Sequence, residues 1–458
     1  MYLPGDSIDG KFLKINPPTV KKTLPNMKGT RLHFLGHWTR QLPIFAFVCF
    51  ISITLFIQTL FIIRGVGHRI IYSDGAGYYA WARSIVYDHD LDFKNDFEIL
   101  YPPDEPPLQP EKTKANKHMN KYPPAMGVLE LPAILVGHIA AIITNYKADG
   151  RSLPFQFSAA IYLTLLNSLG LFFLYKLLMQ EGFAPIWALA ITGTVLCCSN
   201  LIHYMIKEPS LVHGVGFCGI SISLWWFSRL DREFDFRQTM LIGAVMGLFL
   251  SLRYTNIALL PIFGVIFLSH PKKSLSAALG LTTGGLIIMS TLAALSWLHR
   301  GELALGYPNE RFTGGLTGLI STLFSQRHGL FIYHPIYLIL FLTTVIAILK
   351  FIMIIRSLAV SLSFALLWLA NGSWWCWWFG DSFGNRAFIE ILPLLVFGAA
   401  PILLRVQNRY PVKFAFFCAS AVILLGLMNL SYWSGYLLHR FSKQGDHTWS
   451  QAVLWWMQ

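Results

Sequence analysis

Long apolar runs constrain the fold of this chain more than any other feature. They recur from Leu42 to Tyr436, and a run of about 20 apolar residues is long enough to cross the hydrocarbon core of a bilayer as a helix. Hydrophobic residues make up 54% of the 458 residues and charged residues only 13%, a composition typical of membrane proteins rather than soluble enzymes. The sequence therefore predicts an all-α polytopic membrane protein, with one membrane domain over 1–458.

Eleven runs are candidate spans, and two of them need a special reading. The run 124–144 carries Glu130 and Pro132 after a Pro pair, so we expect a juxtamembrane or re-entrant helix that does not cross. The run 240–269 is too long for one span and is interrupted by Arg253–Asn256, so we expect two shorter helices there. About eleven transmembrane helices result, and the remaining candidate spans are 43–63, 156–178, 184–203, 209–228, 276–298, 331–355, 358–377, 388–405 and 413–437.

The distribution of Lys and Arg predicts the orientation. Seven of them precede the first span, which places the basic tail 1–42 in the cytoplasm. The segment 65–123 is then the first outer loop, and with 124–144 not crossing, the basic loop 229–238 lies inside. The C-terminal segment 438–458 becomes a short outer tail. The N-terminus is polar and Pro-rich, so it lacks the apolar core of a cleaved signal peptide.

The net charge and the cysteines exclude two other classes of function. A formal charge of +13 could indicate nucleic-acid binding, but the Lys and Arg residues lie mostly between apolar runs, where membrane topology places them. We therefore expect no nucleic-acid partner. The six cysteines lie in or beside apolar runs without CxxC spacing, which argues against a zinc site and against a disulfide framework.

The first outer loop is unusually acidic for this chain, because six of its 23 Asp and Glu lie within 71–98. Asp74 lies just beyond the first span, beside two glycines that allow tight backbone turns. This carboxylate is either a general base or the cap of a helix. Asp88, Asp90 and Asp92 alternate like a cation site, but the glycine and terminal glutamate of an EF-hand are missing, which favours a structured loop. A divalent metal stays an open alternative.

Basic residues of the outer segments are candidates for binding a phosphate. A guanidinium binds phosphate bidentately and stays charged at every relevant pH. We expect the partner of Arg327 and Arg386 to be a phosphate rather than an internal carboxylate. Lys121 and Tyr122 precede a rigid Pro pair that could aim them from the membrane boundary, although an interfacial anchor would look the same. The candidate phosphate-binding residues are Lys121, Tyr122, Arg253, Arg327 and Arg386.

A second acid and several aromatic residues complete the candidate site. Glu208 precedes Pro209 at a helix start, where it is either a partner of the helix dipole or an acid–base group. Trp residues of "WWCWWFGDSFGNR" are typical of a membrane interface, but indole rings also stack on sugars. The candidates for acceptor or sugar binding are Tyr78, Tyr79, His213, His328, Trp378 and Asp381.

Four segments in this order and spacing resemble bacterial polytopic glycosyltransferases of the GT-C superfamily, including the protein-mannosyltransferase-like membrane proteins. They are "SDGAGYYAWARSIVYDHDLDFKND", "NKYPPAMGVLELP", "LFSQRHGLFIYHP" and "WWFGDSFGNRAFIEILP". The resemblance implies a sugar donor carried on polyprenyl phosphate and an active site on the periplasmic face of the inner membrane. It also implies a catalytic aspartate in the first long loop, matched by Asp74, and a second acid matched by Glu208.

The acceptor and the competing functions stay open. The chain lacks the soluble C-terminal domain of larger family members, which leaves the acceptor class open between a glycan or glycolipid, such as lipopolysaccharide O-antigen, and a protein. A transporter or flippase of lipid-linked saccharides would more often show inverted repeats and polar residues near mid-bilayer. The polar residues here crowd one face instead, which favours glycosyl transfer over transport and over a scaffold in envelope assembly.

Overall fold

A computed structural model describes residues 31–64, 69–101, 111–229, 235–269, 275–303, 306–308 and 310–457, with the side chains of 31–40 left aside. Within these ranges the chain is helical, and its only β-type pairing is an isolated bridge between Lys112 and His118. The all-α prediction is therefore confirmed for the described residues. The expected cytoplasmic tail falls mostly on 1–30, outside the described residues.

Seven helices are long and apolar enough to cross a membrane, judged over the described residues. Six of them are α1 (Arg31–Arg64), α4 (Ala125–Ile143), α5 (Leu153–Gln180), α11 (Leu275–Arg300), α15 (Ile354–Ser373) and α17 (Pro411–Leu437). The seventh is the continuous stretch of η3 (Arg386–Ile391) and α16 (Leu392–Arg409). The chain therefore has the apolar helices of a multi-pass membrane protein, whereas the count of eleven crossings stays a prediction.

Shorter helices complete the bundle. Five of the shorter apolar helices are α6 (Pro185–Cys197), α8 (Val212–Phe227), α9 (Phe236–Leu250), α12 (Gly315–Phe324) and α14 (Ile336–Leu349). The sixth combines η2 (Tyr254–Leu259) with α10 (Leu260–Ser269). The rest are α2 (Ser73–Arg83), η1 (Ser84–Asp88), α3 (Lys94–Leu100), α7 (Leu201–Ile206), α13 (Leu330–Tyr333), α18 (Trp449–Val453) and η4 (Trp455–Met457).

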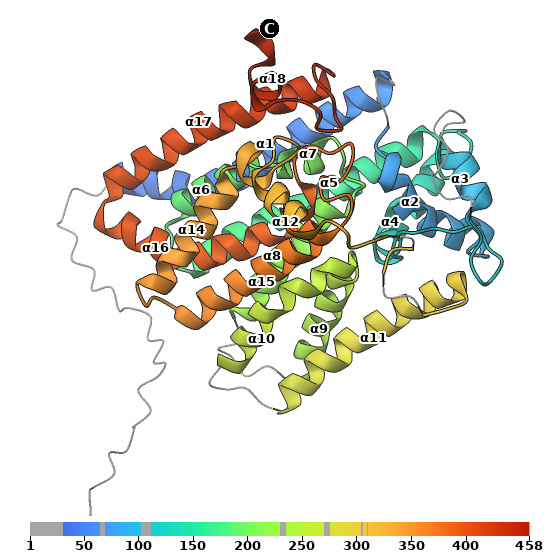
Figure 1. The fold of residues 1–458 in the computed structure, drawn as a ribbon, viewed down its shortest axis with the longest axis horizontal. Helices are drawn as coiled ribbons and strands as arrows, with labels where there is room; N and C mark the ends of the chain where they lie inside the picture. The colour runs from blue at the N-terminus through green and yellow to red at the C-terminus, as the bar shows by residue number, and fades with distance from the viewer. Residues whose placement is uncertain are drawn as a thin grey trace, which may run out of the picture.

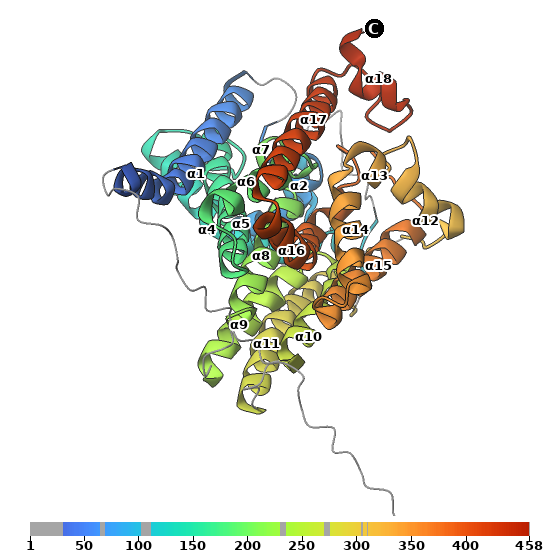
Figure 2. The same cartoon turned by 90° about the vertical axis from the view of Figure 1, so that its left-hand side faces the viewer.

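The bundle has two distinct ends. In Figure 1 the long helices α1 and α17 run along the long axis of the molecule, and α2, α3 and α4 gather at its right-hand end. Figure 2 looks along this axis from the opposite side and shows α6 between α1 and α17, both of which it contacts. We call the end formed by residues 69–101 and 111–123 the loop end, and the end with the turns 350–353 and 409–413 the basic end.

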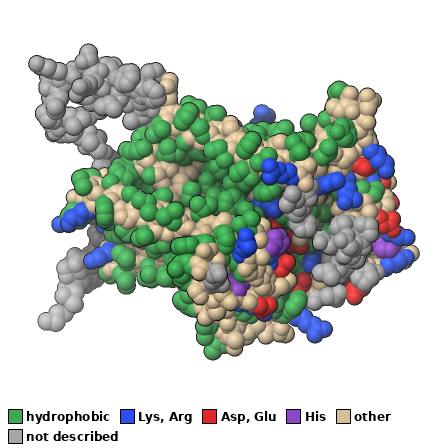
Figure 3. Space-filling view, turned by 90° about the horizontal axis from the view of Figure 1, so that it is seen from above, with side chains coloured by type: hydrophobic (Ala, Val, Ile, Leu, Met, Phe, Trp, Pro, Cys, Tyr) green, Lys and Arg blue, Asp and Glu red, His purple; other side chains and the backbone are tan. Residues whose placement is uncertain are grey.

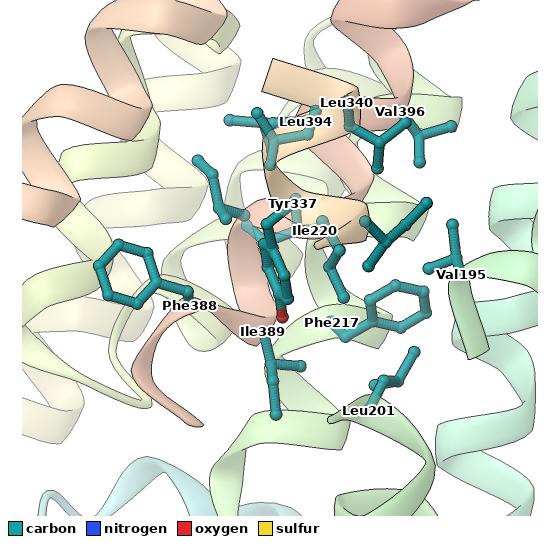
Figure 4. Close-up of a cluster of buried hydrophobic side chains, with 14 of the residues drawn as sticks. Val195, Leu201, Phe217, Ile220, Tyr337, Leu340, Phe388, Ile389, Leu394 and Val396 are labelled. Carbon is teal, nitrogen blue, oxygen red and sulfur yellow. The ribbon is translucent and has the colours of Figure 1, made fainter. Parts of the chain in front are cut away.

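The core centres on α8 and α16. The first half of α16 is buried from Leu392 to Ala400, because helices surround it on all sides. Figure 4 shows Phe217 and Ile220 of α8 in one buried cluster with Tyr337 of α14 and Leu394 of α16. Between membrane helices such side chains stabilise the bundle through close van der Waals packing, because lipid tails are as apolar as the side chains themselves. Because α16 follows η3 directly in the chain, η3 is attached to this packed core.

The predicted interruption of 240–269 is confirmed, and it brings a charged side chain inward. Helix α9 ends at Leu250, and Arg253 has an extended backbone before η2 begins. Its side chain is only 7% exposed. A guanidinium facing lipid would be costly, so the break allows Arg253 to face the protein interior instead. The run 331–355 is also interrupted, because α14 ends at Leu349 and a turn separates it from α15.

Helix α4 lies beside α2 and η1. Tyr122, just before α4, donates a hydrogen bond to Asp74 at the start of α2. Near the other end of α4, His138 is hydrogen-bonded to Tyr87 of η1 over 2.7 Å. Both ends of α4 therefore contact the same segment of the loop end. This arrangement fits the expected juxtamembrane helix, although α4 is long enough to cross, so the assignment stays a prediction.

Buried polar contacts fix the first loop to the bundle. Arg83 donates to Asp88 and to the buried Asp96, each over 2.7 Å. The end of α11 holds the far side of the loop, because His299 Nε2 accepts from the backbone N–H of Asn120 and Arg300 donates to the carbonyl of Lys121. The segment that carries Lys121 and Tyr122 is therefore part of the folded structure.

The two ends of the bundle differ in charge. In Figure 3 the acidic and histidine side chains gather toward the right-hand end, which is the loop end, while hydrophobic side chains cover most of the remaining face. At the basic end Arg356 pairs with Glu181 over 2.8 Å, near the exposed Lys350. Lys and Arg near a span end are typical of the cytoplasmic side. The orientation of the chain in the membrane stays a prediction.

Cysteine accessibility tests this orientation. In a cysteine-free background, a membrane-impermeant maleimide added to spheroplasts should label Lys114→Cys and fail to label Arg237→Cys until the membrane is permeabilised. Both positions are exposed at the protein surface. Tyr146→Cys, just after α4, should be labelled from outside if α4 does not cross. Outside labelling of Arg237→Cys would overturn the predicted topology.

Candidate functional site

Asp74 lies in the first turn of α2, where the helix dipole favours a negative charge. We expected Gly75 and Gly77 to allow turns, and this was wrong, because both lie inside the helix. Their role is close packing. A Cβ at Gly75 would lie 2.1 Å from Ser210 Oγ, and a Cβ at Gly77 would lie 2.2 Å from the Tyr122 ring. The two glycines therefore let α2 approach the residues that surround Asp74.

The carboxylate of Asp74 has two direct partners. Arg386 Nη2 lies 2.7 Å from Oδ2, and the Tyr122 hydroxyl donates to Oδ1 over 2.5 Å. Arg386 therefore has an internal carboxylate as a partner, contrary to expectation, whereas phosphate binding by Arg386 stays a prediction. The physical reason is location: η3 begins beside α2, and a guanidinium that is only 15% exposed requires a nearby counter-charge.

The environment of Asp74 favours its ionised form. Burial raises the pKa of this carboxyl. The positive charges of Arg386 and then Lys121, together with the Tyr122 hydrogen bond, lower the pKa by more than burial raises it. Glu208 acts in the opposite direction as a like charge. The net result is a pKa below the ordinary value, so Asp74 is an anion at neutral pH. For Asp74 to accept a proton, the site must hold the hydroxyl group that donates it directly against the carboxylate.

Glu208 forms a second acidic centre in the turn between α7 and α8. The Tyr72 hydroxyl donates to Oε1 over 2.8 Å, and His203 Nε2 lies 3.5 Å from the same oxygen. The Trp433 indole donates to His203 Nδ1, so the proton of a neutral His203 is on Nε2 and faces Glu208. Burial raises the pKa of Glu208, but His203, Arg386 and Tyr72 together hold it below the ordinary value.

The two acidic centres belong to one site. The Ser210 hydroxyl, two residues after Glu208, donates to the carbonyl of Ile70 over 2.7 Å. This bond and the close contact at Gly75 bring the α7–α8 turn against the start of α2. Arg386 interacts electrostatically with both carboxylates. The sequence therefore identified both acids, and the structure places them around one guanidinium.

Arg253 and His213 form a buried network behind this site. His213 Nδ1 lies 3.1 Å from Glu390 Oε1, and Arg253 Nη1 lies 3.8 Å from Glu390 Oε2. Glu390 belongs to η3, the same turn that begins with Arg386. Arg253 and His213 were predicted to bind phosphate and sugar, and in the structure they face a carboxylate of the protein instead.

The other candidates lie at varying positions around Asp74. Tyr78 packs on the Tyr122 ring at 4.6 Å between ring centroids, and Lys121 lies over the same ring. Tyr79 is fully buried and interacts electrostatically with Glu130.

A separate group includes Arg327, His328 and Trp378. The Arg327 guanidinium stacks on the Trp378 ring at 3.8 Å and donates to the carbonyl of Gln444. His328 Nδ1 is hydrogen-bonded to the carbonyl of Trp378. Asp381, three residues after Trp378, is exposed. These residues join the turn before α13 to the C-terminal tail, which is folded against the bundle.

Sequence reasoning missed Tyr72, His203 and Glu390. Tyr72 is two residues from Asp74, but it lies before α2 in a segment without regular structure, so no sequence pattern predicts where its side chain lies. Glu390 carried a usable signal, since it is an acid inside the apolar run 388–405, where a charge requires a partner.

The described residues contain no group of three or more His, Cys, Asp or Glu side chains that could hold a metal ion. In the Asp88–Asp92 segment the carboxylates already have protein partners. Asp88 binds Arg83, and Asp92 accepts from His118. The alternative of a structured loop therefore agrees with the observed contacts.

Comparison with known proteins gives no relative, because no family model, no curated protein and no solved structure matches the chain.

The depressed pKa of Asp74 predicts how stability depends on pH. Its ionic contacts contribute stability above about pH 4, the ordinary pKa of an unfolded aspartate, and this contribution is lost as the pH falls through the lower folded value. Thermal unfolding of purified protein should show Asp74→Asn less stable than wild type at pH 7. The difference in apparent Tm should shrink below about pH 4. A difference that stays constant with pH would contradict an ionised Asp74 in the folded protein.

Proposed function

We propose that this protein is a membrane glycosyltransferase. It transfers a sugar from a polyprenyl-phosphate donor to a hydroxyl of an envelope glycan or glycolipid, with the loop end as its active site. The proposal places the protein in a bacterial inner membrane with the loop end on the periplasmic face. The sequence resemblance supports the reaction class, and the seven Lys and Arg residues that precede the first span support the orientation.

The observation that carries the proposal is the arrangement around Asp74. One carboxylate contacts a guanidinium and a phenol, and a second carboxylate lies within the field of the same guanidinium. A base next to a fixed positive charge is what sugar transfer from a phosphate requires, because one group must accept a proton while another stabilises the departing anion. The Asp74 side chain is 31% exposed, so it is reachable from outside the bundle.

Asp74 is the proposed general base. The acceptor hydroxyl approaches Asp74, and its oxygen forms a bond to the anomeric carbon while its proton passes to the carboxylate. The bond between the anomeric carbon and the phosphate oxygen breaks, and its electron pair leaves with the polyprenyl phosphate. A single displacement of this kind inverts the configuration at the anomeric carbon. Solvent at the exposed edge of Asp74 then takes the proton.

Arg386 is the proposed phosphate-binding group. A guanidinium has five N–H donors in a planar fork, and Asp74 contacts Arg386 through Nη2. Arg386 can therefore hold the base and the phosphate together. Lys121, in the segment before α4, adds a second positive charge near Asp74. Glu208, with its hydrogen bond from Tyr72, is placed to contact the sugar or the acceptor.

A lipid-linked saccharide transporter explains this arrangement less well. Alternating access requires a polar site near mid-bilayer that both faces can reach. In this protein Asp74 and Glu208 lie at the loop end, and the charged groups buried behind them are paired with one another, whereas apolar side chains pack closely around α16.

Replacing the base tests the proposal. Asp74→Asn keeps the shape of the side chain but removes proton acceptance, so sugar transfer should fall by roughly 10²-fold or more. The assay is transfer from a radiolabelled polyprenyl-phosphate hexose or pentose by protein in nanodiscs, with acceptor glycolipid extracted from the envelope. Donor affinity should survive, because Arg386 and Lys121 remain.

Glu98→Gln is the control, because it makes the same change from acid to amide at an exposed carboxylate of the first loop. Its turnover should match that of wild type. Turnover close to wild type in Asp74→Asn would remove this residue from the mechanism and make Glu208 the next candidate base.

Arg386→Gln should weaken donor binding as well as turnover, because the guanidinium binds the phosphate in the ground state and stabilises it on departure. We expect a loss of roughly tenfold or more in donor affinity, the usual scale for a charged hydrogen bond. Binding is measured with immobilised protein and fluorescent polyprenyl phosphate. Arg440→Gln, at an exposed arginine over the Trp455 ring, is the control for general loss of positive charge. Equal affinities in the two variants would contradict a phosphate site at Arg386.

A further inference from the structure

The η3 turn, residues Arg386–Ile391, is held by a buried ionic network. Glu390 is 1% exposed, and its two oxygens face different elements. Oε1 lies 3.1 Å from His213 Nδ1 in α8, and Oε2 lies 3.8 Å from Arg253 Nη1 at the break between α9 and η2. The network therefore joins three segments of the core through one side chain.

Arg253 holds η3 at a second point. Its Nη1 donates to the carbonyl of Ala387 over 3.3 Å, and Asn371 of α15 donates to the same carbonyl. Ala387 directly follows Arg386, so the backbone contact lies beside the residue that pairs with Asp74. Fixing both Ala387 and Glu390 leaves the turn little freedom to rotate.

Close packing of α8 leaves no room for Glu390 to move. A Cβ at Gly216 would lie 2.6 Å from Glu390 Cγ, well below an ordinary contact. His213 lies three residues earlier, on the adjacent turn of the same helix. Glycine at this position therefore allows the carboxylate to reach both of its partners.

We propose that Glu390, Arg253 and His213 are positioning residues, which hold η3 so that the Arg386 guanidinium faces Asp74. The inference deepens the proposed function and rests on it for its catalytic meaning. Arg253 then acts through η3 and not as a direct phosphate ligand. A buried carboxylate that has one charged partner and one hydrogen-bonded partner is costly to disrupt, because removing it leaves a guanidinium uncompensated in a region of low dielectric.

The experiment measures the protonation of Asp74 directly. A carbodiimide couples an amine to a carboxyl group in its protonated form, and peptide mass spectrometry reports the extent of labelling at Asp74 separately from Glu208. Labelling at Asp74 is divided by labelling at the exposed Glu98 to remove the pH dependence of the reagents, and the midpoint of this ratio against pH follows the pKa of Asp74. Purified full-length protein is compared in four forms: wild type, Arg386→Gln, Glu390→Gln and Glu181→Gln.

We expect the midpoint to rise by roughly half a pH unit or more in Arg386→Gln, because an adjacent positive charge favours the ionised carboxylate. Glu390→Gln should raise the midpoint in the same direction by displacing Arg386, whereas loss of the negative charge of Glu390 alone would lower the midpoint. Glu181→Gln, which breaks the ion pair with Arg356 at the basic end, should leave it unchanged. A purely structural role for Glu390 would reduce the yield of folded protein without moving the midpoint.

Two outcomes overturn the proposal. One is a wild-type midpoint in Glu390→Gln alongside a raised midpoint in Arg386→Gln. The other is an unchanged midpoint in Arg386→Gln itself. If Glu390→Gln does not fold, Gly216→Ala replaces it, since the added methyl group displaces Glu390 while all charges are kept.

The labelling requires no sugar transfer, so its result is independent of the enzymatic assay. A raised midpoint in a protein that transfers no sugar would uphold the positioning network and reject the proposed function.

Discussion

The ion pair between Asp74 and Arg386 joins parts of the chain that are 312 residues apart. Asp74 belongs to the first loop, whereas Arg386 begins the turn that leads into α16. Of the seven candidate spans among the described residues, the one containing α16 is the most buried, because 78% of its most apolar stretch lies inside the protein. A single contact therefore connects the first loop of the chain to the most buried of the candidate spans. The geometry of the site depends on both.

Other buried charges in this protein follow the same physical requirement. Arg253 faces Glu390, Arg356 faces Glu181, and Arg83 faces Asp96. In a region of low dielectric each cation requires a counter-charge, and the helix breaks and turns supply the backbone freedom to bring the partners together. The η3 turn is where two of these pairs meet, because Arg386 and Glu390 are both part of it. Structure and proposed chemistry are therefore linked through one short segment.

Much of the architecture follows from the sequence, because apolar runs and isolated charges have local causes. The interruption at Arg253 was predictable, since a guanidinium cannot stay inside a lipid-facing helix. The helix containing Gly75 and Gly77 was not, because two glycines disfavour a helix and only tertiary packing against Ser210 and Tyr122 stabilises it. Asp74 and Arg386 were each identified as candidates, but no local pattern predicts contact across 312 residues.

The central claim is that a lipid phosphate binds beside Asp74 at the loop end. The most direct measurement is an electron cryomicroscopy map of the protein in nanodiscs with added polyprenyl phosphate. The account predicts density for the phosphate within hydrogen-bonding distance of the Arg386 guanidinium, with the prenyl chain leading from the loop end into the bilayer. Phosphate density only at another place, such as the apolar groove between α17 and α18 lined by Trp449 and Trp455, would contradict it.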